Sequence, residues 1–123
     1  MITWGVSANS HNASLTVFDR DSILFSSHSE RFSKIKNDPH LNKYIINYAE
    51  HWGPPSEIIW YEDPFLKSIR QLKAGQGLWF GKNNIEKYMA QFNIFSPIVK
   101  MSHHESHAAA GYYTSGFDNA TIV

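Results

Sequence analysis

Residues 2–28 read ITWGVSANSHNASLTVFDRDSILFSSH, and this stretch decides the fold class. Three runs rich in β-branched and aromatic residues, at 2–8, 13–18 and 23–28, are separated by short polar segments. Runs of this length predict strands, and the polar segments predict tight turns because Asn, Asp and Ser side chains bond to nearby backbone. Three short strands joined in this way predict an antiparallel meander.

Helices and strands alternate after the meander. Apolar residues at helical spacing predict three helices: one begun by Asp38-Pro39 and reaching 52, one at 64–73 begun by Asp63, and one capped by Asn83 and reaching 92. Apolar runs at 57–61 and 96–101 predict strands, the first of them parallel to a meander strand. The predicted class is therefore α/β.

The helix faces expected to be buried each carry apolar residues three or four positions apart. They are Leu41, Tyr44, Ile45, Tyr48, Ala49 and Trp52 on the first helix, Phe65, Ile69 and Leu72 on the second, and Ile85, Tyr88, Met89 and Phe92 on the third.

The 123-residue chain carries eleven basic and eleven acidic side chains and no cysteine. The balanced charge gives no electrostatic reason to bind nucleic acid or an anionic membrane. Because there is no thiolate, a metal would have to be held by histidine and carboxylate. No apolar run approaches the roughly 18 residues of a membrane span, and the N-terminus lacks a signal-peptide pattern, so we expect a cytoplasmic protein.

The strongest chemical signal is the segment HHESHAAAGYY, which begins at His103. Ser102 and Glu105 form the Ser-x-x-Glu pattern of a capping box, which predicts a helix starting there. On that helix His103 and His107 lie about 40° apart with a rise of about 6 Å, so both imidazoles can hold one metal ion. His104 points about 100° away from the pair. The simpler alternative is a polar helix end without a metal.

A charged segment, SERFSKIKND at 29–38, follows the meander and contains Arg31 and Lys36. A solvated loop is the simpler interpretation of this segment. The alternative is an anion-binding loop for a phosphate or carboxylate group.

Three motifs in fixed order resemble the opening of the nodulation- and antibiotic-type O-carbamoyltransferases. That family begins with a Gly-x-x-x-x-x-His-Asp-Ala-Ser strand-turn-strand, matched here from Gly5 to Ser14. A Glu-Glu-Arg-Phe-Ser-x-x-Lys-His segment follows, matched by 29–37, and then a His-His-x-x-His-Ala segment, matched by 103–108. The resemblance implies that residues 1–123 are the N-terminal part, and an incomplete part, of the metal-containing domain of such a protein.

The resemblance also implies a fold and a metal site. The family's metal-containing lobe is similar to the universal tRNA-threonylcarbamoyladenosine synthesis protein, so the expected fold is half of an actin-like ATPase lobe of the RNase H-like type. His103 and His107 would bind a divalent metal, with Fe²⁺ first and Zn²⁺ or Mg²⁺ as alternatives. An aspartate from the second half of the lobe would complete the site.

A reaction is implied as well. Family members form carbamoyl-adenylate from ATP and carbamoyl phosphate in a downstream domain, and transfer the carbamoyl group to a hydroxyl in the metal-containing lobe. His11 would act as general base or position the carbamoyl group, and Lys36, a second catalytic candidate, would hold anionic oxygens together with Arg31. Asn12 and Ser14 would contribute to binding the substrate or nucleotide.

Four positions depart from the family pattern. Asn12 stands in place of an acidic residue, Ser29 in place of a glutamate, Asn37 in place of a histidine and Gly116 in place of a proline.

Three interpretations therefore stand side by side. The chain is the first part of a carbamoyltransferase and inactive without the remainder, or a binding or regulatory half-lobe that pairs with a separately encoded second half, or a structural remnant. The apolar segment 78–81 and an unfinished strand expected at 120–123 favour pairing with the missing half, with a partner chain, or with a second copy as a homodimer.

Overall fold

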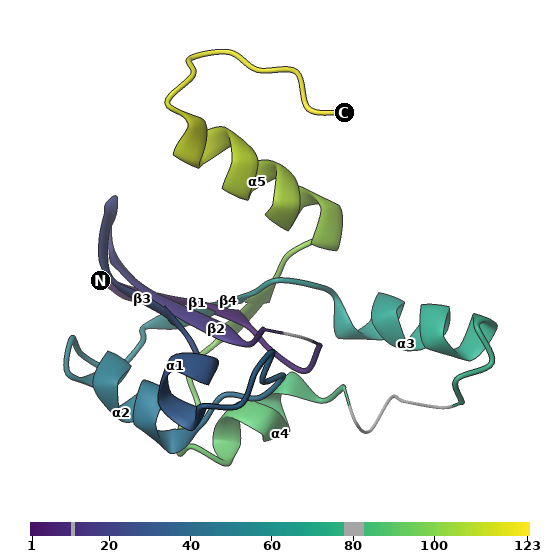
Figure 1. Ribbon diagram of the computed structural model, residues 1–123, viewed down its shortest axis with the longest axis horizontal. Helices are drawn as coiled ribbons and strands as arrows, with labels where there is room; N and C mark the ends of the chain where they lie inside the picture. The colour runs from purple at the N-terminus through teal and green to yellow at the C-terminus, as the bar shows by residue number, and fades with distance from the viewer. Residues whose placement is uncertain (11, 78–82) are drawn as a thin grey trace.

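A five-stranded mixed sheet forms the centre of the protein (Figure 1). The computed structural model describes residues 1–10, 12–77 and 83–123. The elements, in chain order, are β1 (Ile2–Ser7), β2 (Ser14–Asp19), β3 (Ser22–His28), α1 (Glu30–Ser33), α2 (Lys43–Glu50), β4 (Glu57–Trp60), α3 (Pro64–Lys73), α4 (Ile85–Ala90), β5 (Ile98–Lys100) and α5 (His103–Ser115).

The sheet confirms the predicted meander and the predicted α/β class. Strand order is β3-β2-β1-β4-β5, with β1 in the middle. β1 pairs antiparallel with β2 through Trp4 opposite Val17, and β2 pairs antiparallel with β3. On its other side β1 pairs parallel with β4 through Trp4 opposite Ile58, as predicted, and β4 pairs parallel with β5.

These pairings bring four strand ends to one edge of the sheet. β1 and β3 are both antiparallel to β2, so they run in the same direction, and β4 and β5 run parallel to β1. The carboxyl ends of β1, β3, β4 and β5 therefore lie at the same edge. Loops at such an edge are where α/β proteins commonly place binding groups.

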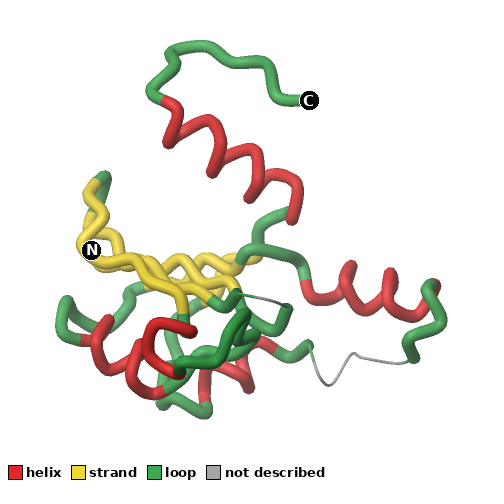
Figure 2. The backbone as a smooth tube through the Cα atoms, viewed as in Figure 1, coloured by secondary structure: helices red, strands yellow, loops and turns green. Residues whose placement is uncertain are grey.

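One face of the sheet carries the core. Alternate strand residues such as Trp4, Leu15 and Ile58 are fully buried on this face, which α2 and α4 cover with Ile45 and Met89 among others. In Figure 1 α1, α2 and α4 lie on one side of the sheet and α5 on the other, and Figure 2 shows the same division with helices in red and strands in yellow. No helix in the described residues is long and apolar enough to cross a membrane.

The start predicted for α2 was wrong. Asn42, not Asp38, caps this helix, and its side-chain oxygen accepts from the backbone N–H of Tyr44 and of Ile45. Asp38 instead accepts from the backbone N–H of His40 within the loop. The carbonyls of Asp38 and Pro39, which would accept the first helical bonds, accept instead from backbone N–H groups of the turn after β1, so no helix begins there.

The face predicted for α2 was wrong in part. Leu41, Ile45 and Ala49 are buried as predicted, and Ile46 joins them. The aromatic residues of the predicted stripe are exposed instead: Tyr44, Tyr48 and Trp52. Tyr48 packs instead beside the core, against the rings of Phe25 and Phe32.

The cap and bounds of α3 are confirmed, because Asp63 accepts from the N–H of Phe65 and of Leu66. Its predicted inner face was wrong, since Phe65 is 60% exposed and Leu72 is also exposed. The buried residue of α3 is Ser68, which lies near Asn83. In Figure 1 this helix projects beside the sheet instead of covering it.

Two further boundaries differ from the prediction. Asn84, not Asn83, caps α4, although the buried pair Ile85 and Met89 was predicted correctly. Residues 120–123 do not form a strand, and they are exposed. A strand needs a neighbouring strand to pair with, and α5 separates this segment from the sheet (Figure 1). The apolar segment 78–81 lies outside the described residues.

Replacing Tyr88 with Phe tests the packing of α4 against the loop before α2. The Tyr88 hydroxyl accepts the backbone N–H of Leu41 at 2.8 Å, and burial raises the pKa of Tyr88 from 10.0 to about 12. The folded chain holds this proton more tightly than the unfolded chain, so its contribution to stability is complete below pH 10 and is lost as the pH rises through 12. From pH 10 to pH 12 we expect the wild type to lose about 2 kcal/mol more unfolding free energy than Tyr88→Phe.

Chemical denaturation at a series of pH values measures this difference. Tyr44→Phe is the matched control, because Tyr44 is 58% exposed. Parallel stability profiles for the wild type and Tyr88→Phe would contradict the prediction.

Candidate histidine site at the carboxyl edge of the sheet

The three motif segments all follow strands that end at the same edge. The turn at 8–13 follows β1, the charged segment at 29–38 follows β3, and His103 follows β5. Between them, Tyr61 and Glu62 follow β4. The sheet therefore gathers, along one edge, segments that lie far apart in the sequence.

His103 and His107 face each other as the helical spacing predicts. Their Nε2 atoms are 3.2 Å apart, and their rings lie nearly perpendicular with centroids separated by 4.7 Å. His103 is partly buried, whereas His107 is exposed. The two rings lie on one face of α5, and the cap that starts this helix is the predicted one, because Ser102 Oγ accepts from Glu105 N–H.

The separation of 3.2 Å fits two states of the pair. It is the length of an N–H···N hydrogen bond between one protonated and one unprotonated Nε2. It also fits two ligands that each lie about 2.1 Å from a shared metal ion, with an angle of about 100° at the metal. Within residues 1–10, 12–77 and 83–123, no group of three His, Cys, Asp or Glu residues is placed to hold a metal ion. The pair therefore brings two possible ligands together without a third among the described residues.

Glu62 is the central charged group beside this pair. Only 5% of the residue is exposed, at the second position after the last residue of β4. Its Oε1 accepts a hydrogen bond from the Tyr61 hydroxyl at 2.6 Å and another from Lys67 Nζ at 2.6 Å. Its Oε2 lies 3.8 Å from His103 Nδ1 and 3.8 Å from an Arg70 guanidinium nitrogen. A buried carboxylate requires such partners, since an unpaired one would be strongly destabilising.

The Glu62 cluster, which consists of Glu62 with Tyr61, Lys67 and His103, links several elements of the edge. Lys67, on α3, donates both to Glu62 and to the backbone carbonyl of Asn9 at 3.1 Å, in the turn after β1. The Tyr61 ring lies edge-on to the His103 ring with centroids 5.8 Å apart. Burial, followed by the hydrogen bond to Glu62, raises the pKa of Tyr61, so its hydroxyl remains a donor at any physiological pH.

His103 Nδ1 is a buried polar atom without a hydrogen-bond partner in the structure. Glu62 Oε2 lies 3.8 Å from this nitrogen, which is an ion-pair distance but too long for a hydrogen bond. Such orphaned atoms are rare in proteins. The donor set at this end of α5 therefore fits a metal ligand whose second ring nitrogen is oriented by a carboxylate.

Hydrogen bonds, more than packing, attach α5 to the sheet. None of its residues is fully buried. Ser106 Oγ donates to the Tyr61 carbonyl at 2.8 Å, and Met101 N–H donates to the Trp60 carbonyl at 3.0 Å. The helix ends at Gly116, whose φ of 74° is the left-handed conformation that glycine favours. Glycine at this departure from the family pattern therefore has a conformational reason.

The charged segment lies at the far end of the same edge. Arg31 and Lys36 are exposed, and they line a shallow depression together with Glu30, Lys34 and Ile35. β3 and β5 are four strand positions apart, so Arg31 and His103 follow strand ends separated by about 19 Å. The structure does not bring these cations into contact with the histidine pair.

The turn after β1 joins the charged segment to the Glu62 cluster. Its backbone is held by the loop before α2, since Ala13 N–H donates to the Asp38 carbonyl and Asn9 N–H to the Pro39 carbonyl, both at 2.8 Å. Lys67 Nζ also donates to the Asn9 carbonyl in this turn. The edge is thus continuous from the charged segment to the Glu62 cluster.

The remaining candidates lie in or beside this turn. His11, the predicted base, lies outside the described residues. Ser14 is the first residue of β2, where it is paired with Ser7 and His28. Asn12 and Asn37 have φ values of 54° and 56°, a left-handed conformation in which asparagine is enriched. Both departures from the family pattern are therefore explained by the backbone.

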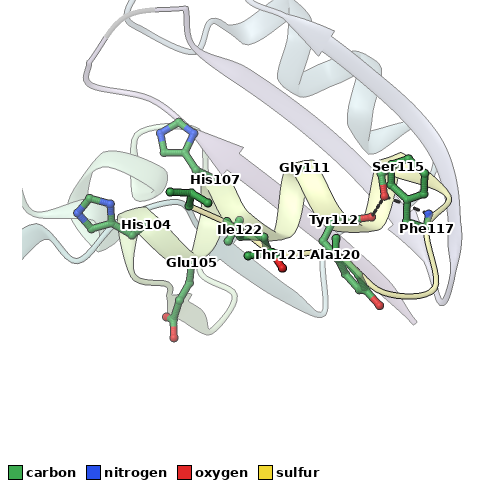
Figure 3. A pocket seen from close by; sticks show the side chains of 12 residues that line it. His104, Glu105, His107, Gly111, Tyr112, Ser115, Phe117, Ala120, Thr121 and Ile122 are labelled. Carbon is green, nitrogen blue, oxygen red and sulfur yellow. Dashed lines mark hydrogen bonds between the residues drawn. The ribbon is translucent and has the colours of Figure 1, made fainter.

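A wide groove of about 720 Å³ lies between α5 and the segment that follows it (Figure 3). Small and apolar residues such as Ala108, Gly111 and Ile122 form much of its lining. His104 and His107 also border the groove, whereas His103 is not one of its lining residues. In Figure 3 the Glu105 side chain points away from His107, which agrees with a role at the helix start instead of at a metal.

Sequence reasoning missed Glu62 and Lys67. A carboxylate directly after the strand predicted at 57–61 was the available signal, because a parallel strand that ends beside β5 places its next residue near His103. Strand order was needed to use that signal. Lys67 lies four residues after its own helix cap and carried no sequence signal.

Comparison with known proteins gives one similarity. No family model matches the chain. The uncharacterized protein sll1178 of Synechocystis sp. (strain ATCC 27184 / PCC 6803 / Kazusa) is 24% identical over 148 aligned residues, which cover 97% of this chain and 24% of that protein. The chain therefore spans about a quarter of the length of the curated relative it matches.

Replacing Ser106 with Ala tests how α5 is held. Loss of the hydrogen bond to the Tyr61 carbonyl removes about 1 kcal/mol from the attachment of the helix to the edge. We expect amide hydrogen exchange within α5 to become about fivefold faster, while exchange in β1 and β4 is unchanged. Ser115→Ala is the control, because the Ser115 hydroxyl donates within the helix, to the Tyr112 carbonyl. Equal exchange rates in both variants would show that Ser106 does not hold α5.

Proposed function

We propose that this chain is the N-terminal portion of a carbamoyltransferase-like protein and contributes two histidine ligands to its metal site. The observation that carries the proposal is the 3.2 Å separation of the His103 and His107 Nε2 atoms, on a helix that begins at the carboxyl edge of the sheet. The proposed activity is transfer of a carbamoyl group to a hydroxyl by way of carbamoyl-adenylate, formed from ATP and carbamoyl phosphate.

The fold supports this proposal at a coarser level. An antiparallel meander followed by parallel strands is what half of an actin-like ATPase lobe requires, and the sheet has that order. The three segments that resemble the family motifs also follow strands of one sheet edge. A shared edge is a reason for such segments to occur together in one protein, because a single extended ligand can lie along it.

Different residues along the edge would bind the metal and the anionic groups. His103 and His107 would hold the divalent metal, Fe²⁺ first, which when bound would polarise an oxygen of the substrate as a Lewis acid. Arg31 and Lys36 would bind anionic oxygens of a nucleotide or acyl phosphate through charge-assisted hydrogen bonds. The ends of the strands that precede these groups lie about 19 Å apart, a span that suits an extended ligand better than a small one.

The second candidate function is a half-lobe that binds or regulates and pairs with a separately encoded second half. The exposure of α5 favours it, because none of the helix's 13 residues is buried. Leu66 and Leu72 on α3 are exposed as well. A helix normally buries one face, so these surfaces suit a covering chain segment. In both candidates the missing metal ligand comes from that segment.

Anaerobic titration calorimetry with Fe²⁺ and with Zn²⁺ tests the metal half-site. We expect binding of one metal ion per chain, weakened at least tenfold, about 1.4 kcal/mol, in the double variant His103→Ala, His107→Ala, because both Nε2 ligands are then lost. His104→Ala is the matched control, since His104 belongs to the same helix turn but its ring points away from that of His107 (Figure 3). Equal binding by the wild type and the double variant would contradict the proposed site.

The reaction is tested in the complete gene product that contains these residues. The measurements are carbamoyl-phosphate-dependent release of pyrophosphate from ATP and transfer of a ¹⁴C-labelled carbamoyl group to a panel of hydroxyl compounds. In the double histidine variant we expect pyrophosphate release to persist and transfer to fall by at least about a hundredfold, because only transfer uses the metal lobe. Absence of both activities in the wild type would favour the half-lobe that pairs with a partner.

A further inference from the structure

We propose that Glu62 is a positioning residue for the histidine pair, which holds His103 as the tautomer that is protonated at Nδ1 and leaves its Nε2 lone pair free for a ligand. The proposal rests on the proposed metal site and concerns residues outside the three motifs that resemble the family. Its basis is the juxtaposition of a buried carboxylate, an orphaned ring nitrogen and a second imidazole.

The first step concerns the two nitrogens of His103. Nε2 faces His107 Nε2 at 3.2 Å, whereas Nδ1 is buried on the opposite side and faces Glu62 Oε2 at 3.8 Å. A neutral imidazole carries one proton, and the partner of one nitrogen determines where that proton lies. A carboxylate accepts only, so it stabilises the tautomer with the proton on Nδ1.

The second step concerns how Glu62 is held. Its Oε1 is occupied by two short hydrogen bonds, from Tyr61 and from Lys67. Its Oε2 is left to face His103 Nδ1 and the more exposed Arg70 guanidinium, each 3.8 Å away. The Lys67 side chain is itself largely buried and is fixed at its other contact by Asn9 O. Carboxylate direction is therefore set by β4, α3 and the turn after β1 together.

The third step concerns the distance. At 3.8 Å the Nδ1–Oε2 contact is too long for a hydrogen bond, and a shift of less than about 1 Å would make it one. Contacts of this kind are often long in unliganded sites and shorten when a ligand binds.

The arrangement also determines which tautomer is expected for His107. If His103 Nε2 is unprotonated, the 3.2 Å contact is a hydrogen bond only when His107 carries its proton on Nε2. The two histidines of the pair are therefore expected to be opposite tautomers in the metal-free chain. For both Nε2 atoms to serve as ligands, the Nε2 proton of His107 would have to move, through solvent, to Nδ1 of the same ring.

Long-range ¹H–¹⁵N NMR spectra of the metal-free chain at mildly alkaline pH test the proposal directly, because they separate protonated from unprotonated ring nitrogens. We expect His103 to be protonated at Nδ1 and His107 at Nε2 in the wild type. In Glu62→Gln, the amide can donate or accept, and we expect His103 to lose this preference and appear as a mixture. Glu86→Gln is the matched control, because Glu86 is paired with Lys100 at 3.4 Å on the surface, on a different element.

Metal titration of the same proteins gives a second measurement. We expect Glu62→Gln to weaken metal binding about 10- to 100-fold, the usual effect of removing a carboxylate behind a histidine ligand. Glu86→Gln should bind like the wild type. The proposal would be overturned if His103 were protonated at Nε2 in the wild type. It would also be overturned if Glu62→Gln changed neither the tautomer of His103 nor the metal affinity.

The wild-type spectrum decides the proposal even where Glu62→Gln fails to fold, because it requires no variant. It also separates this inference from the proposed function. A wild type that shows the expected tautomers but binds no metal would leave the positioning by Glu62 supported and would contradict the metal site.

Discussion

The pairing of β1 on both of its sides is the constraint on which the rest of the structure depends. β1 is antiparallel to β2 and parallel to β4, so its two neighbours run in opposite directions. Its side chains Trp4 and Val6 are buried against α2 and α4, which fixes the register, because a slip of one residue would turn both to the open face. Strand direction then places the loops that follow β1, β3, β4 and β5 at one edge.

The buried carboxylate of Glu62 places a second, electrostatic constraint on the same edge of the sheet. An isolated charge in this position would be strongly destabilising, and the structure compensates it with Lys67 and the Tyr61 hydroxyl. Because these partners come from different elements, the cluster depends on the relative placement of β4, α3 and the turn at 8–13. A site oriented in this way is rigid where it adjoins the sheet, while α5 beyond it is exposed.

The errors in the predicted helices have one physical origin. Apolar spacing shows that a helix has a face, but not whether that face is covered. On α2 the tyrosines of the stripe lie outside the aliphatic contact with the sheet, and on α3 the apolar side chains Phe65 and Leu72 are exposed. The caps at Asp63 and Ser102 were predictable because a cap is a local interaction between a side chain and the next two or three backbone N–H groups.

The sequence by itself determined the meander, the parallel fourth strand, the cap of α5 and the facing of His103 and His107. The meander, the cap and the facing histidines depend on interactions between neighbouring segments or on the fixed geometry of a helix turn. The parallel strand follows from the helix before it, because a strand-helix-strand connection favours a parallel pair. Only the tertiary structure decided that Glu62 and Lys67 lie beside the histidines and that Arg31 and Lys36 lie at the far end of the edge. Those distances depend on strand order, which arises from burial of the whole sheet face and leaves no mark in local sequence.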